Sequence, residues 1–142
     1  MRANGWWDNE ERTIARYKLM PGWDWQDLCL LLDQTEAIAR KQQSAVHCII
    51  DMQDVEPAPI ALQLCNSTLQ DGRRFVTRAR EVNFAIAVIG ASLLIKTLYS
   101  RFEIAYTDGA ARLHFVSSLE QARVLLSKYQ GFGAGIAVTA SA

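Results

Sequence analysis

The chain has 142 residues, half of them hydrophobic, and its 15 basic residues are balanced by 15 acidic ones. This length predicts one domain with an apolar core. The balanced charge argues against nucleic acid or an anionic membrane as a partner. The amino terminus lacks the apolar stretch of a secretory signal, and the longest apolar run, at 84–95, is shorter than the ~20 residues of a membrane-spanning helix. We therefore expect a cytoplasmic protein without an integral membrane segment.

The first elements are predicted to be two antiparallel strands and a helix. Residues 5–7 form a short strand, 8–11 supply turn residues, and 13–20 alternate apolar and polar side chains. Asp24 can cap a helix that reaches about Lys41, with negative charge in its first turn and positive charge in its last. Its apolar stripe is Leu28, Leu31, Leu32, Thr35 and Ile38.

Two apolar segments, 46–52 and 84–89, have no polar face and indicate strands of a parallel sheet that is covered on both sides. Pro57 and Pro59 mark the start of the helix that follows the first of them, because proline is tolerated in a first turn. Gly72 either interrupts this helix or faces inward and allows close approach to the sheet. Further along this helix, Arg73, Arg74 and Arg78, with Arg80, are interpreted as a solvated face; the alternative is a phosphate-bearing partner.

A third helix is predicted from Ser92 to about Tyr106, and it is apolar on nearly all sides. Such a helix is either deeply buried or covered by a partner. Asp108-Gly109 turns the chain into a strand at 112–116, and Ser118 with Gln121 forms a capping-box pattern for a fourth helix.

The element order is therefore β-β-α-β-α-β-α-β-α. It predicts an α/β domain over residues 1–130, built on a single mixed, largely parallel sheet of about five strands with four helices. Residues 131–142 are rich in small side chains and are expected to form a flexible tail.

The carboxyl ends of the parallel strands are where we expect a ligand. The amides of Ala91, Ser92 and Leu93 open a helix directly after a strand and can hold an anion or carboxylate, with Lys96 one turn further on. The alternative is that Ser92 only caps its own helix.

Two carboxylates, Asp51 and Asp54, end the central strand, with Glu56 nearby. Paired carboxylates can perform acid–base chemistry or bind a metal, and solvated or ion-paired acids are the alternative. His47 and His114 have no ligand at metal spacing. We therefore predict no catalytic set, no metal and no cofactor.

The three cysteines, Cys29, Cys48 and Cys65, are odd in number and lack metal-type spacing. We interpret them as reduced thiols in the core of a cytosolic protein, with a reactive nucleophile as the alternative for Cys65.

All four tryptophans lie within the first 25 residues. Trp23 and Trp25 either pack the first hairpin against the first helix or contribute to a partner interface, where tryptophan is common. Tyr99 and Phe102 of the apolar third helix are expected at the same interface.

These segments together resemble the SpoIIAA-like branch of the STAS superfamily. The resemblance covers about residues 5–130 and is carried by Trp7–Tyr17, Trp23–Leu28, Val46–Met52, Val88–Leu98 and Arg112–Ala122. It implies a small bacterial protein with a four-helix, mixed-sheet domain, used for regulation through contact with a protein partner or a second copy.

In anti-anti-sigma members of the superfamily, a Ser or Thr that begins the helix after the central strand is phosphorylated. This chain has no hydroxyl residue between Asp51 and Ser67, which is expected well inside the helix, so the switch is not carried over. A similarity in topology to Sec14-like lipid-binding modules implies a small acid or lipid ligand as the alternative function.

Overall fold

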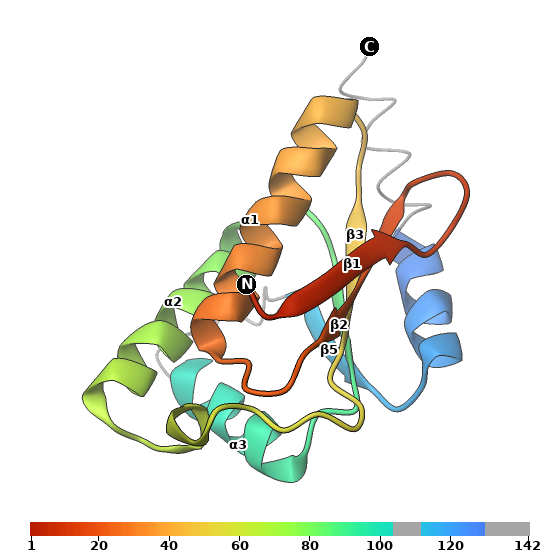
Figure 1. The fold of residues 1–142 in the computed structure, drawn as a ribbon. Coiled ribbons are helices and arrows are strands. Elements are labelled where there is room, and N and C mark those ends of the chain that lie inside the picture. The colour runs from red at the N-terminus through yellow and green to blue at the C-terminus, as the bar shows by residue number, and fades with distance from the viewer. Residues whose placement is uncertain (104–111, 130–142) are drawn as a thin grey trace.

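The structure is a computed structural model, and it describes residues 1–103 and 112–129 (Figure 1). One sheet has five strands in the order β1-β2-β3-β4-β5. β1 is antiparallel to β2, and all other neighbouring strands are parallel. The strands are β1 Ala3–Trp7, β2 Ile14–Leu19, β3 His47–Asp51, β4 Ile86–Ile89 and β5 Leu113–Val116. The predicted mixed, largely parallel sheet is confirmed.

Helices cover both faces of this sheet. The connections between parallel strands hold α1 (Trp25–Gln42), then the short 3₁₀ helix η1 (Pro59–Leu62) with α2 (Asn66–Glu81), then α3 (Leu93–Phe102). Each connection moves one strand along the sheet, and parallel crossovers are right-handed, so these helices lie on one face. A fourth helix at 119–129 covers the other face (Figure 1).

The β3–β4 pair lies at the centre and is buried on both sides. Ile50 faces Val88, and both pack into the core beneath α1, α2 and α3. Ile49 faces Ala87, and both pack against the helix at 119–129. These opposite contacts explain why neither sequence segment has a polar face.

The predicted cap of α1 is confirmed. The Asp24 carboxylate accepts from the Asp27 N–H at 3.0 Å, and the Asp27 carboxylate accepts from the Asp24 N–H at 3.0 Å, which completes a capping box. The predicted stripe faces the core, with Ile38 at its half-buried end.

The predicted start of the second helix is wrong. Pro59 opens only η1, and α2 begins at Asn66. Gln63 is extended, with φ −108° and ψ 145°, and ends η1. Side chains from other parts of the fold hold this turn: Ile60 O accepts from the Thr68 hydroxyl at 2.6 Å, and Ala61 O accepts from the Trp25 indole N–H at 2.9 Å.

Gly72 lies within an unbroken α2, and its close approach is to α3 rather than to the sheet. A Cβ atom placed there would lie 2.2–2.4 Å from three ring atoms of Phe102. Glycine at this position thus sets how closely α2 and α3 pack.

Three predicted features lie outside the described residues: the end of the third helix near Tyr106, the turn at Asp108-Gly109 and the tail at 131–142. Across 1–103 and 112–129, no helix combines the length and the apolar character needed to cross a membrane.

We predict that Gly72→Ala lowers the free energy of unfolding by about 1–3 kcal/mol, because the added methyl overpacks the Phe102 ring. Urea denaturation measures this change. Gln70→Ala, an exposed position of the same helix, is the control and leaves stability nearly unchanged. Because alanine is favoured over glycine in a helix interior by up to about 1 kcal/mol, a Gly72→Ala protein more stable than the wild type by that amount would contradict the close approach.

Candidate functional site

The segments that follow β3 and β4 touch each other at the carboxyl edge of the sheet. Gly90 has φ +75°, and a Cβ atom on it would lie 2.9 Å from both the N and the Cα of Gln53. Met52 also donates its N–H to Ile89 O at 2.8 Å. The structure therefore brings the two predicted ligand segments together, and Gly90 is required both for its φ and for the contact.

Asp51 organises this edge through ion pairs. Its buried carboxylate accepts from the Gln53 N–H at 2.8 Å and lies 3.4 Å from Lys18 Nζ and 4.0 Å from an Arg16 guanidinium nitrogen. Lys18 also donates to the carbonyl of Gln53. The ion-paired alternative thus describes Asp51. Asp54 lies exposed at the turn beyond it, at φ +59°.

Ser92 caps its own helix. Its hydroxyl accepts from the Ile95 N–H at 3.2 Å, and its carbonyl accepts from the Lys96 N–H at 3.0 Å. Ala91 is half-buried, whereas Ser92, Leu93 and Lys96 are exposed. The capping alternative accounts for the position of Ser92, and the neighbouring exposed residues form an accessible surface beside it.

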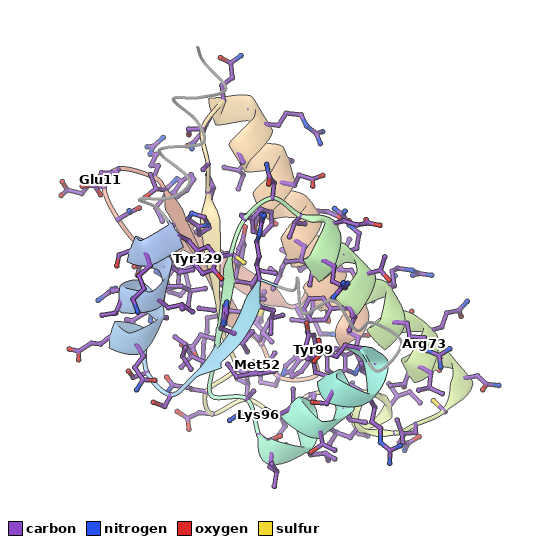
Figure 2. The ribbon with its side chains drawn as sticks, turned by 180° about the vertical axis from the view of Figure 1, so that it is seen from behind. Glu11, Met52, Arg73, Lys96, Tyr99 and Tyr129 are labelled. Carbon is purple, nitrogen blue, oxygen red and sulfur yellow. The ribbon has the colours of Figure 1, made fainter. Side chains whose placement is uncertain are left out.

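The four residues expected at a partner interface lie in the core instead. Trp23, Trp25, Tyr99 and Phe102 are only 1%, 2%, 4% and 1% exposed. The Trp25 ring lies 4.9 Å from Phe102 and 6.0 Å from Phe75, which joins α1, α3 and α2. The Tyr99 ring, labelled in Figure 2, lies 6.1 Å from that of Phe75 and 5.5 Å from that of Phe115. The packing alternative therefore describes these rings, and an interface has to use other side chains.

Exposed apolar side chains do occur at this edge, on the segments after β3 and after β4. We call them the apolar edge residues: Ile60, Leu64, Leu93 and Leu94, exposed by 45%, 53%, 80% and 47%. The segments that carry them pack together, because η1 contacts α3. Sequence reasoning missed the first two by placing them inside a long helix. Leu93 and Leu94 were expected to belong to a helix that is apolar on nearly all sides. Their position directly after the Ser92 cap, in the exposed first turn of α3, was not considered.

The arginines of α2 do not form one basic patch. Arg73 projects outward from α2 (Figure 2) and Arg74 lies 3.7 Å from Asp71, so both fit the solvated face. Arg78 differs. It lies 2.7 Å from Asp33 of α1 and 3.3 Å from Glu81, and the hydrogen bond to Asp33 raises its pKa. Arg78 thus fastens α2 to α1.

A second set of charges, at the turn between β1 and β2, was not anticipated from the sequence. The carboxylate of Asp8, 3% exposed, accepts from two nitrogens of Arg123 at 2.9 Å each and lies 3.8 Å from Arg16. The Arg16 guanidinium in turn lies 5.2 Å from the centre of the Trp6 ring. Because Asp8 and Arg123 are far apart in the chain, no local pattern reveals this bond, which holds the helix at 119–129 to the hairpin.

The three cysteines fall into two chemical classes. Cys29 and Cys48 are buried, and burial raises the pKa of each thiol, to about 11 for Cys29. Cys65 is half-buried at the N-cap of α2, and its hydrogen bonds with the Ser67 and Thr68 hydroxyls lower the pKa of its thiol to about 7. The prediction of a core thiol is therefore wrong for Cys65, because the helix starts at that residue.

The two histidines hold structural hydrogen bonds. His47 Nδ1 accepts from the Ala85 N–H at 2.9 Å, and burial, with a smaller effect from Arg112, lowers the pKa of this imidazole. His114 Nε2 lies 2.9 Å from the Tyr129 hydroxyl, and burial lowers its pKa too. In the part of the chain that the structure describes, no group of three His, Cys, Asp or Glu side chains is arranged to hold a metal ion.

A scan of protein-family models and a search of curated proteins each give no match to this sequence. The resemblance to the SpoIIAA-like branch therefore rests on the sequence segments that carry it, and function is argued from the site.

We predict that Cys65 is alkylated first by iodoacetamide at pH 7.5, because the thiolate is the nucleophile and a pKa of about 7 leaves most of this thiol ionised. Peptide mass spectrometry over time measures the order of labelling. Ser67→Ala, which removes the first hydrogen bond to the sulfur, slows labelling of Cys65. Labelling of Cys48 at the same rate in the folded protein would contradict the assignment.

We predict that the folded state loses stability as the pH falls below about 6.5, the ordinary histidine pKa. The unfolded chain takes up protons there that the folded His47 and His114 resist, so the slope for one group reaches about 1.4 kcal/mol per pH unit. Denaturation between pH 5 and pH 8 measures it. The Asn side chain of His47→Asn keeps an acceptor for the Ala85 N–H but does not titrate, so this variant is expected to lose less stability as the pH falls. An unchanged pH profile would show that groups other than His47 cause the pH dependence.

Proposed function

We propose that the chain is a non-catalytic regulatory module of the SpoIIAA/STAS-like type, which acts in the cytoplasm by binding a protein partner at the carboxyl edge of its sheet. The observation that carries the proposal is the exposure of the apolar edge residues, above all Leu93 at 80%. Removing a leucine side chain from water contributes about 1.5–3 kcal/mol, so a partner that covers these residues gains affinity from each of them.

Local hydrogen bonds and packing hold the framework beneath this surface. The Ser92 cap fixes the first turn of α3, and the contact between Gly90 and Gln53 joins the two segments. Exposed Lys96 and Asp54 supply charge of both signs at the edge. The expected partner therefore offers apolar side chains flanked by polar or charged groups, as protein interfaces do.

The phosphorylation switch of anti-anti-sigma proteins is not part of this proposal, although the structure places a hydroxyl residue nearer the start of α2 than the sequence predicted. Ser67 is exposed in the first turn of α2, not deep inside a helix as expected. The long segment from Asp51 to Asn66, with η1 within it, still departs from the pattern in which the hydroxyl residue opens the helix after the central strand.

The alternative is a carrier or sensor for a small acid or lipid, with its head group at residues 91–93 and its tail between α3 and the sheet. That space is occupied by side chains of α3. Ile95, Leu98, Tyr99 and Phe102 are all buried, and the Tyr99 ring packs edge-to-face against Phe115 of β5. A lipid tail would have to displace this packing, so we place the carrier second.

We predict that a photo-crosslinking residue at Leu93 captures one defined protein in the native host, and that the same residue at Val124 does not. Val124 is the matched control because it is also a highly exposed apolar position, on the helix at 119–129. p-Benzoylphenylalanine at each position, followed by mass spectrometry of the adducts, makes the comparison.

The capture at Leu93 is expected to fall at least tenfold when Leu94→Asp is added, because the charge would be buried by the partner. Identical adducts at Leu93 and Val124, or none at Leu93, would refute the proposed surface. A small molecule released by denaturing freshly purified protein, and detected by native mass spectrometry, would favour the carrier instead.

A further inference from the structure

A second surface, distinct from the apolar edge residues, is the outer edge of β1. Within residues 1–103 and 112–129, β1 is the first strand in the sheet order and pairs only with β2; it is the edge strand in front in Figure 1. Asn4, Gly5 and Trp6 are exposed along it. Natural proteins usually protect such edges with charged side chains, proline or a bulge. β1 reads Ala-Asn-Gly-Trp-Trp and has none of these.

The phase of the β1–β2 ladder fixes which backbone groups face outward. Asp8 N donates to Ile14 O and Met20 N donates to Arg2 O, both at 2.9 Å, so the pairs 8/14 and 2/20 are hydrogen-bonded. Bonded and non-bonded pairs alternate in an antiparallel ladder. Ala3, Gly5 and Trp7, which face Leu19, Tyr17 and Ala15, therefore form non-bonded pairs and direct their N–H and C=O groups to the free edge.

We propose that β1 pairs antiparallel with β1 of a second copy of this chain, about a two-fold axis through Gly5, so that the two sheets become one continuous sheet. In this register Ala3 faces Trp7 of the second copy and Gly5 faces its counterpart. Each facing pair then exchanges both of its N–H···O bonds. All outward groups of the strand are satisfied in the one register that overlaps the whole of β1, and the interface is isologous.

The side chains are compatible with this pairing. β1 has no charged residue, so two copies do not repel each other directly. The exposed Trp6 faces Asn4 of the second copy on the same side of the sheet, and pairing covers an indole that is 46% exposed in the single chain.

Oligomeric state tests the proposal. Sedimentation equilibrium of the full chain is expected to give the mass of two chains. Ala3→Pro removes an outward N–H at the first residue of an edge strand, where proline is tolerated, and is expected to give the mass of one chain. Trp6→Lys adds the charge that usually protects such an edge and has the same expected result. Val124→Lys, a matched exposed substitution away from β1, stays dimeric. Far-UV circular dichroism confirms that each variant is folded.

The register is tested by a disulfide. Residues 4 and 6 of opposite copies form a non-bonded pair with Cα atoms about 4.5 Å apart, a distance that a disulfide can span. Asn4→Cys with Trp6→Cys, in a Cys65→Ser background, is expected to oxidise to a covalent dimer, whereas Asn4→Cys alone is not.

A monomeric wild type at all concentrations would overturn the proposal. So would a dimer that survives both Ala3→Pro and Trp6→Lys, since it would use another face. Capture of a different protein's strand by a monomeric chain would assign the edge to that partner. The dimer and the partner surface at Leu93 use different residues, so the failure of one leaves the other intact.

Discussion

The parallel pairing of β3 with β4 is the constraint on which the rest of the structure depends. These two strands supply four facing pairs, and every side chain in them is buried on one face of the sheet or the other. A buried strand can satisfy its backbone only by pairing with neighbours on both edges, so β2 and β5 are needed as well. The positions of α1, α2 and α3 then follow from the right-handed connections between successive strands.

The same constraint separates the packed parts of the molecule from those open to partners. The centre of the sheet is closed by helices above and below. The carboxyl edge carries turns and helix starts, and one side of β1 has no strand partner in the described part of the chain. The aromatic cluster around Trp25 belongs to the closed part, because it binds α1, α2 and α3 to one another. The two surfaces that we propose for interactions therefore consist of less conspicuous groups, such as the Leu93 side chain and the backbone of Gly5.

The sequence predicted correctly those elements that are determined by residues close together in the chain. The capping box of α1, the hydroxyl cap at Ser92 and the apolar strands at 47–51 and 86–89 each carry their signal within a few residues. The start of α2 could not be predicted in this way, because the turn before it is held by a bond from the Trp25 indole, distant in sequence, to the Ala61 carbonyl. The same holds for the partners of Asp51, which lie on β2. Trp23, Trp25, Tyr99 and Phe102 were expected at an interface because aromatic residues are common there, but the structure shows that these side chains are buried in the core.

The arrangement of the last helix has a consequence for how the chain is synthesised. Sheet strands lie in chain order, so one layer of the protein assembles progressively as the polypeptide leaves the ribosome. Ile49, Ala87 and Ile89, however, stay uncovered until the segment that contains Ala122, Arg123 and Leu126 emerges and is anchored to Asp8. Before that helix has been synthesised, these side chains form an exposed apolar surface, and transiently exposed apolar surface favours aggregation.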